Sequence, residues 1–242
     1  MLKAFKSFAF ISLACLASHA SASVLFSDNF NTPTSLPNGQ DNAQQSITGF
    51  NVTYGATFAN WTANSNSHAI HLVNLNNAGA GSTDWAAMLF DGGGGLNDNV
   101  ITSTEITSGN TLGQSYSVSF DLAAAQYNTP SQATGSTDGI IVEVLNSLDV
   151  VIQTQTFLPG AFDSSASSNS LPFKEETLNY TGTGSGNGGV FLEFTANNAG
   201  SGHFGGTIDN VQLASVPEPQ SYLLMLAGLA AMATLVKRRK QI

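Results

Sequence analysis

The side chains best suited to bind a ligand in this sequence are two tryptophans that stand among polar residues. Trp61 follows Asn60, and Trp85 follows Asp84. An aromatic ring can stack on the apolar C–H groups of a sugar while neighbouring amides and carboxylates bind its hydroxyls, so both tryptophans are candidates for carbohydrate binding. A domain of this size also buries a few large aromatic side chains in its core, and the sequence leaves both interpretations open.

Carboxylates and histidines give no recognisable catalytic signature. His68 and His71 are three residues apart, which on a strand places them on opposite faces and makes shared metal ligation unfavourable. No nucleophile elbow marks a catalytic triad. Two carboxylates that act on a glycosidic bond can be far apart in sequence, so an enzyme that acts on polysaccharide stays open as an alternative. Glu143, Glu175 and Glu176 are interpreted as solvated strand positions.

Two glycine-rich stretches, 91–98 and 182–189, are interpreted as flexible surface turns. The first lacks the lysine and the serine or threonine that a phosphate-binding loop needs. It also provides only a single poor copy of a calcium-binding nonapeptide, whereas such repeats act as stacked copies.

The N-terminal segment 1–22 has the three parts of a secretory signal peptide. Lys3 and Lys6 precede the apolar run 8–16, and the small residues Ala20 and Ala22 follow it. This pattern predicts that signal peptidase cleaves after Ala22 and that the chain is exported.

Residues 23–215 are strongly acidic and contain no cysteine, because Cys15 lies in the signal segment. Lys174 is the single basic residue in this range against fifteen acidic ones, which gives a net charge of about −14. A surface of this sign repels nucleic acid and anionic lipid and attracts cations, so nucleic-acid binding is excluded as a main role. Without disulfides, stability must come from burial, backbone pairing or a bound ion.

The C-terminal segment 216–242 combines a proline-rich motif, an apolar stretch and a basic cluster. Pro217, Glu218 and Pro219 precede the apolar stretch 222–236, and four basic residues occupy 237–240. As a helix, these 15 residues would span roughly 22 Å against a hydrocarbon core of about 30 Å, which suits a temporary membrane span. The basic cluster favours the cytoplasmic side and leaves the domain outside. A plain C-terminal anchor is equally compatible with these residues alone.

These three parts, in this order, resemble the PEP-CTERM sorting signal of Gram-negative bacteria. The resemblance implies that exosortase, an integral-membrane cysteine protease or transpeptidase, recognises Pro217, Glu218 and Pro219. It further implies export through the inner membrane, transient anchoring there, and a final place at the cell surface or outside the cell. Members of this family are common in bacteria that build biofilms rich in exopolysaccharide.

The body, 23–215, predicts an all-β fold. Apolar and polar residues alternate at 116–122, and similar patterns recur without any sustained helical period. About ten short strands without helices predict a two-sheet antiparallel β-sandwich, or jelly roll. The predicted strands are 24–30, 47–58, 69–75, 99–106, 116–122, 139–145, 150–157, 173–180, 189–195 and 207–213.

The two ends of the body, 25–30 and 206–213, resemble the first and last strands of galactose-binding-like jelly rolls. Those folds include many carbohydrate-binding modules. The resemblance implies that Asp209, with Asp28 as companion, helps to hold a structural calcium ion.

The sequence therefore favours a non-catalytic, exported module associated with extracellular polysaccharide or the biofilm matrix. The alternative is a hydrolase or lyase on a jelly-roll scaffold, because a fold alone does not decide function. A purely structural role in the matrix is close to the first hypothesis.

Overall fold

The computed structural model describes most of a β-sandwich and little of the chain's two ends. The residues it describes are 22–35, 51–54, 57–64, 70–74, 85–90, 100–124, 138–159, 173–198, 204–217, 228–229 and 232. The strands belong to a compact unit, Val24–Ser215, and the remaining residues form a second unit. In that second unit, Gly228, Leu229 and Met232 are helical. Among the residues described, no helix is long and apolar enough to cross a lipid bilayer.

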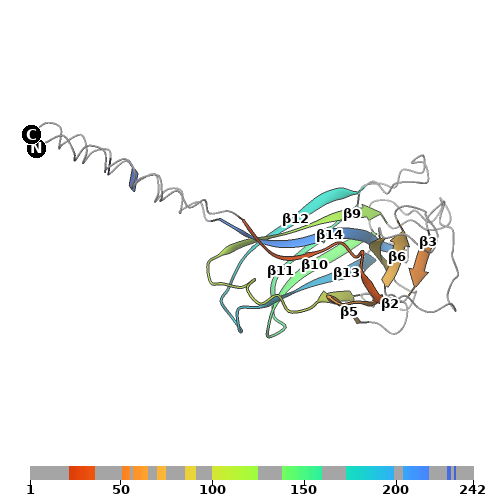
Figure 1. Ribbon diagram of the computed structural model, residues 1–242, viewed down its shortest axis with the longest axis horizontal. Helices are drawn as coiled ribbons and strands as arrows, with labels where there is room; N and C mark the ends of the chain where they lie inside the picture. Colours follow the sequence, from red (N-terminus) through yellow and green to blue (C-terminus); the bar gives the residue numbers. More distant parts are fainter. Residues whose placement is uncertain are drawn as a thin grey trace, which may run out of the picture. The chain divides into compact units, whose positions relative to one another are not determined.

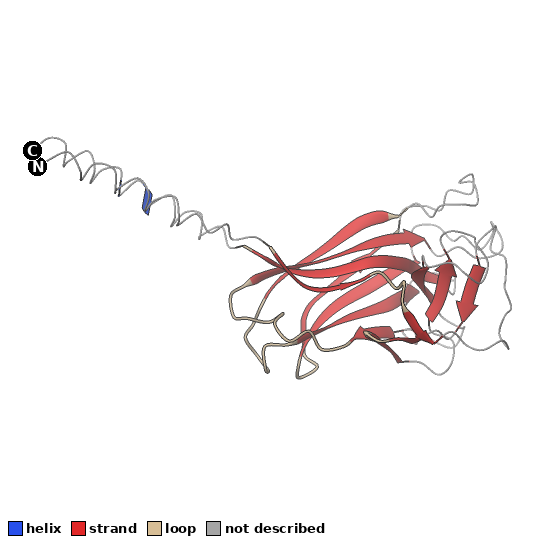
Figure 2. Ribbon diagram, viewed as in Figure 1, coloured by secondary structure: helices blue, strands red, loops and turns tan. Residues whose placement is uncertain are grey.

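Fourteen strands are described, and they form two sheets of seven, as predicted for an antiparallel sandwich (Figures 1 and 2). Sheet 1 has the order β12-β9-β14-β7-β6-β3, with β1 also paired to β14. Its strands are β12 (Lys174–Thr181), β9 (Ser115–Ala124), β14 (Phe204–Val216), β7 (Trp85–Phe90), β6 (Ile70–Asn74), β3 (Asn51–Tyr54) and β1 (Ser23–Asp28).

Sheet 2 has the order β11-β10-β13-β8-β5-β4-β2. Its strands are β11 (Val151–Phe157), β10 (Asp138–Asn146), β13 (Val190–Asn198), β8 (Val100–Ser103), β5 (Trp61–Asn64), β4 (Thr57–Phe58) and β2 (Pro33–Ser35). Each pair of neighbours in this order is antiparallel.

The predicted strand 47–58 is wrong as a single element. Within it, β3 pairs with β6 in sheet 1 and β4 pairs with β5 in sheet 2, so the chain changes sheets inside this range. Three strands, β2, β5 and β7, were not predicted. β7 reads as a continuous apolar run, and Ala86, Ala87 and Leu89 are all buried, so it lacks the alternation of a half-exposed strand.

The core is built by alternation along the long strands. On β9, Tyr116, Val118, Phe120 and Leu122 are buried, while the residues between them are partly exposed. This period of two matches the pleat of a strand with one face on the core.

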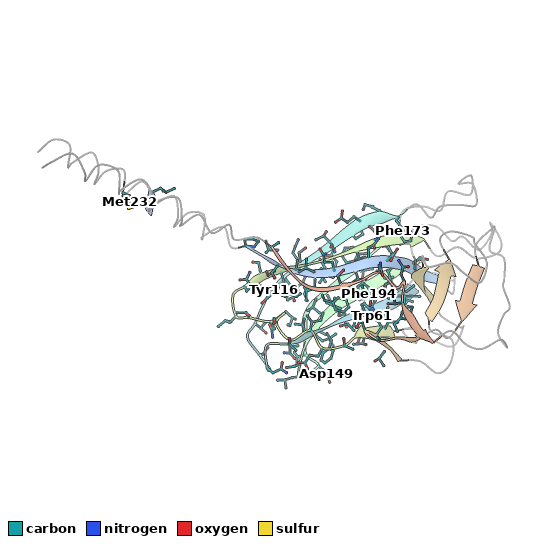
Figure 3. All side chains as sticks on the ribbon, viewed as in Figure 1. Trp61, Tyr116, Asp149, Phe173, Phe194 and Met232 are labelled. Atoms are coloured by element: carbon teal, nitrogen blue, oxygen red, sulfur yellow. The ribbon has the colours of Figure 1, made fainter. Side chains whose placement is uncertain are left out.

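A chain of edge-on aromatic contacts joins the two sheets through the core. The ring of Phe120, from sheet 1, lies 5.4 Å from that of Phe194 and 5.1 Å from that of Phe157, both from sheet 2. Phe194 in turn lies 5.7 Å from Trp61 (Figure 3). Edge-to-face geometry at these distances is favourable beyond the area that it buries.

Candidate functional site

Trp61 is a core residue. Its side chain is 5% exposed, and its ring lies 5.6 Å from Phe26, 5.4 Å from Phe30 and 5.7 Å from Phe194. The indole nitrogen is buried and makes no hydrogen bond within the described residues. Because other aromatic rings enclose it, Trp61 offers no face to a sugar, which corrects the carbohydrate-binding prediction for this residue.

Trp85 begins β7 and is paired with Asn74 of β6. Its side chain lies outside the described residues, so its assignment to carbohydrate binding stays a prediction. His71 pairs with Met88 on the same two strands, while His68 lies outside the described residues.

Asp28 and Asp209 lie on the paired strands β1 and β14. Asp28 accepts hydrogen bonds from the Phe30 backbone N–H and from Asn60 Nδ2, both at 2.8 Å, and so fixes the turn that follows β1. Asp209 is 5% exposed and accepts a bond of 2.7 Å from the Asn210 N–H.

The described residues contain no group of three or more His, Cys, Asp or Glu placed to hold a metal ion. Calcium takes six to eight oxygen ligands, including backbone and amide carbonyls as well as carboxylates. A calcium ion at Asp28 and Asp209 would therefore draw most of its ligands from carbonyl oxygens. The buried carboxylate of Asp209 has the chemistry that such an ion needs.

The loop 182–189 is a surface turn, as predicted, and hydrogen bonds join it to the rest of the sandwich. The fully buried Asn110 accepts from the Thr183 N–H at 2.6 Å and donates through Nδ2 to the Ser185 carbonyl at 2.8 Å. Alternate glycines have positive φ angles, which only glycine adopts without strain. These glycines are Gly184, Gly186 and Gly188.

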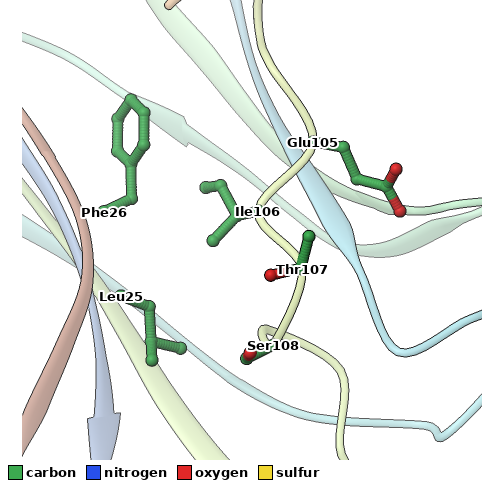
Figure 4. A pocket seen from close by; sticks show the side chains of 6 residues that line it. All are labelled: Leu25, Phe26, Glu105, Ile106, Thr107 and Ser108. Carbon is green, nitrogen blue, oxygen red and sulfur yellow. The ribbon is translucent and has the colours of Figure 1, made fainter.

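The structure describes a shallow pocket of about 180 Å³ (Figure 4). It is lined by Leu25 and Phe26 of β1 and by residues 105–108. The Glu105 carboxylate accepts a bond of 2.6 Å from Asn187 Nδ2, and Figure 4 shows it directed away from the pocket. Ligand pockets usually have volumes of about 300–1,000 Å³, so this pocket is too small to be the candidate site.

The outer face of sheet 2 instead gathers polar side chains in one row across five strands. Glu143 of β10 is paired with Glu193 of β13, and Glu193 is paired with Thr102 of β8. Thr154 of β11 and Thr62 of β5 continue the row at its two ends. Four inter-strand spacings make this row about 19 Å long.

The register proves that these side chains share the outer face. Val142 and Val144, on either side of Glu143, are fully buried, and so are Leu192 and Phe194 on either side of Glu193. Successive side chains of a strand point to opposite faces, so both glutamates point away from the core. We call Glu143, Glu193, Thr102, Thr154 and Thr62 the carboxylate row.

Burial raises the pKa of the Glu193 carboxyl above its ordinary value. A hydrogen bond of 3.2 Å from the Thr102 hydroxyl opposes this shift, and the negative charges of Glu143 and Asp149 add to it. Desolvation and a facing carboxylate both favour the protonated form. Glu193 is therefore the member of the row that is best suited to hold a proton and donate a hydrogen bond.

An aromatic side chain lies beside the carboxylate row. Phe191 is half-buried and two residues from Glu193 on the same strand, so the two side chains share the outer face, about 7 Å apart along the strand. Phe191 is paired with Leu145 of β10. A ring flanked by hydroxyls and carboxylates combines stacking with hydrogen bonding, as sugar recognition requires.

Sequence reasoning missed this arrangement although it predicted four of the five strands that carry it, all but β5. Glu143 was interpreted as a solvated position, and neither Glu193 nor Phe191 was singled out. Only the register of β10 against β13 brings the two glutamates opposite one another. The available signal was a charged residue set between Leu192 and Phe194 in a strand of otherwise apolar and β-branched residues.

Comparison with known proteins identifies the C-terminal segment. Residues 215–240 match the family model described as the PEP-CTERM protein-sorting motif. The tail is a PEP-CTERM sorting motif. This motif implies export and membrane-anchored sorting by exosortase, as in Gram-negative bacteria.

Of the predicted processing residues, the structure describes Ala22, which is exposed, and Pro217, which follows β14. Ala20, Glu218 and Pro219 lie outside the described residues.

Several solved structures resemble the sandwich at low identity, and no curated protein matches the sequence. A Stig cyclase from Fischerella sp. TAU is 13% identical, with 81% of this chain and 99% of that chain covered and a TM-score of 0.48. TmCBM61, solved with β-1,4-galactotriose, is 15% identical over 64% and 88% of the two chains, with a TM-score of 0.39. The CBM22 tandem of Paenibacillus barcinonensis Xyn10C is 11% identical over 82% and 47%, with a TM-score of 0.44.

Proposed function

We propose that this PEP-CTERM protein is a non-catalytic module that binds extracellular polysaccharide through the outer face of sheet 2. The observation that carries the proposal is the carboxylate row with Phe191 beside it. A row of about 19 Å matches an extended chain of several sugar rings better than it matches a single small ligand. The sorting motif supports this function, because it directs the domain out of the cell, where such chains are found.

The side chains of the row supply the contacts that sugar hydroxyls need. Thr102, Thr62 and Thr154 each donate and accept hydrogen bonds. Glu143 accepts, and Glu193 both accepts and, when protonated, donates. Phe191 adds an apolar surface for the C–H face of a ring. After release from signal peptidase and exosortase, we expect the domain to reside at the cell surface or in the matrix.

The test is a thermal melt of the mature full chain over a panel of bacterial polysaccharides. A ligand that binds only the folded state raises the melting temperature. At a ligand concentration one hundred times Kd, the free energy of unfolding increases by about 2.7 kcal/mol. We expect one class of glycan to produce this rise, and the F191A variant to lose most of it. F173A, a half-buried phenylalanine outside the row, is the matched control. A rise that survives F191A, or no rise with any glycan, contradicts the proposal.

One observation favours hydrolysis as the second candidate. Glu143 and Glu193 face each other on paired strands, where Cβ atoms lie about 4.5–5.5 Å apart, and retaining glycosidases hold two carboxyl groups about 5–5.5 Å apart. The raised pKa of Glu193 would suit the acid. Release of reducing ends from the bound glycan, abolished in E143Q and E193Q, would establish an enzyme. Unchanged glycan with retained binding supports the module.

We also propose that calcium is a structural ligand at Asp209 and Asp28. The support is a buried carboxylate on β14 next to β1, in a domain whose negative charge attracts cations. Calcium should raise the melting temperature and a chelator should lower it, because the ion binds only the folded state. D209A should remove this response. The control variant is D121A. Asp121 of β9 accepts a hydrogen bond from the side chain of Asn210, the exposed residue that follows Asp209 on β14.

A further inference from the structure

Exposed apolar side chains gather at one end of the sandwich. Within the described part of Val24–Ser215, the large apolar residues that are exposed are Val24, Leu112, Leu148, Val150, Val151 and Leu158. Val24 lies at the start of β1 and Val151 at the start of β11, while the others except Leu158 lie in the loops 104–114 and 147–150, which Figure 2 shows with loop 182–189 in tan at the same end. We call Val24, Leu112, Leu148, Val150 and Val151 the apolar tip.

Close contacts join these loops to one another. A side chain at Gly184 would touch the Cβ atom of Leu112, so Leu112 lies against loop 182–189 on one side. On the other side, Ser147 Oγ accepts a bond of 3.0 Å from the Asn187 N–H, and Asn146 Nδ2 donates to Ser185 Oγ at 3.0 Å. The two leucines therefore flank the same rigid loop.

Leu112 and Leu148 each lie in a tight turn that leaves the side chain exposed. Leu112 occupies the tip of the turn 111–114, which is closed by a bond of 3.1 Å from the Gln114 N–H to the Thr111 carbonyl and has Gly113 at φ 77°. It is 76% exposed. A positive φ at the third residue defines a type II turn and is best met by glycine.

In the second turn, Asn146 Oδ1 accepts from the N–H groups of Leu148 and Val150 at 2.9 and 3.1 Å. Leu148 is 65% exposed, and Asp149 has φ 57°. Turn tips usually carry Gly, Asn, Asp or Ser, so a leucine at the tip of two adjacent turns is unusual for a surface that meets only water.

The chain leaves the sandwich for the sorting motif at this same end. A Cβ atom on Gly109 would lie 3.2 Å from Leu213 Cδ2. The last residues of β14 therefore lie against the loop that carries Leu112. The sorting motif begins at residue 215, and its apolar stretch begins at Tyr222. Seven residues span at most about 25 Å, so the end of β14 stays within that distance of the apolar stretch.

We propose that the apolar tip rests in the interface of the membrane while the sorting motif anchors the chain. Leu112, Leu148 and Val150 enter the boundary between headgroups and acyl chains and thereby hold the exported domain against the bilayer. The partner surface is zwitterionic lipid, because the acidic domain and the nearby carboxylate of Asp149 repel anionic headgroups. The inference rests on the sorting motif and does not depend on glycan binding.

The test measures the depth of single labels in the anchored full chain. A polarity-sensitive fluorophore is attached to L112C or L148C in a C15S background, and the chain is reconstituted in phosphatidylcholine vesicles with brominated acyl chains. Interfacial side chains lie about 5–10 Å into the headgroup boundary, so we expect at least about twofold quenching at both positions. L158C is the matched control, because Leu158 is an exposed leucine outside the tip, and its emission should not change.

A second variant separates the tip from the anchor. In an L112S/L148S chain with the label at V151C, quenching should fall to the level of L158C, since the two leucines provide most of the apolar contact. Loss of roughly two buried leucines weakens interfacial contact by at least about tenfold. Equal emission at tip and control positions overturns the proposal. Concentration-dependent changes without lipid quenching would assign the tip to a second copy of the chain, and would overturn it as well.

Discussion

Along β10 and β13, Val142 and Phe194 are fully buried, whereas Glu143 and Glu193, their direct neighbours in sequence, are half-exposed on the opposite face. The inner face of sheet 2 contacts sheet 1 through rings, while the outer face mixes the polar carboxylate row with partly exposed apolar side chains such as Phe191. The same strands thus bury apolar side chains on one side and expose polar groups on the other. Because a strand alternates with a period of two, each property can change without the other.

The largest expected loss of stability comes from a substitution on the inner face of sheet 2. F194A removes a fully buried ring that contacts both Trp61 and Phe120, so we expect a loss of about 3–5 kcal/mol in the free energy of unfolding. Denaturant unfolding measures this value. F191A, three residues away on the outer face, should lower it by only about 1 kcal/mol, because that ring is half-buried. Comparable losses in the two variants would mean that the outer face is also a packed interface.

A smaller effect is expected at a polar group of the inner face. Ser103 is 3% exposed, accepts a bond of 2.9 Å from the Leu192 N–H and donates to the Thr104 carbonyl. S103A leaves a buried N–H without its acceptor, which costs about 1–3 kcal/mol. Hydrogen exchange at Leu192 and denaturant unfolding report the change. S117A, on the partly exposed face of β9, provides the control, and an equal loss there would argue against a special role for Ser103.

The smallest expected change in the free energy of unfolding comes from the ionisation of Glu193 on the outer face of sheet 2. Burial raises the pKa of Glu193 in the folded chain, so its contribution to stability is fully present below the unfolded pKa and is lost as the pH rises through the folded pKa. As the pH rises from about 4 to about 7, the free energy of unfolding of E193Q should therefore increase relative to that of the parent chain. The gain should stay below about 1 kcal/mol because the side chain is half-exposed.

Denaturant unfolding of both chains at the two pH values measures this gain. T102V should enlarge the pH dependence of the parent chain, since the Thr102 hydrogen bond lowers the pKa. A difference between E193Q and the parent that does not change with pH would show that the charge of Glu193 is not what distinguishes the face.

The sequence predicted the sandwich because alternation is a local property. The strand 116–122 shows every second residue apolar, and the structure confirms it as β9. The carboxylate row could not be predicted in the same way, since Glu143 and Glu193 are opposite only through the register of two strands. Local composition left Trp61 open between the core and a ligand surface, and only the fold decides between them by placing the ring among Phe26, Phe30 and Phe194.

The loop 182–189 illustrates a second limit. Its glycines and polar residues are typical of a flexible turn, yet a buried side chain 73 positions away in sequence, Asn110, fixes it by hydrogen bonds to Thr183. No pattern within the loop reveals such a partner. The sorting tail was predictable for the opposite reason, because its motif, apolar stretch and basic cluster follow one another without a gap.

The place of β14 in sheet 1 has a mechanical consequence. This 13-residue strand lies between β9 and β7, also pairs with β1, and leads directly into the sorting motif. Tension on the tail therefore pulls along a strand held from both sides. Ladder hydrogen bonds lie across the strand direction, so such a pull shears many of them at once instead of unzipping them singly. A chain that is pulled through its sorting motif is thus loaded along β14, the direction in which many ladder hydrogen bonds must break together.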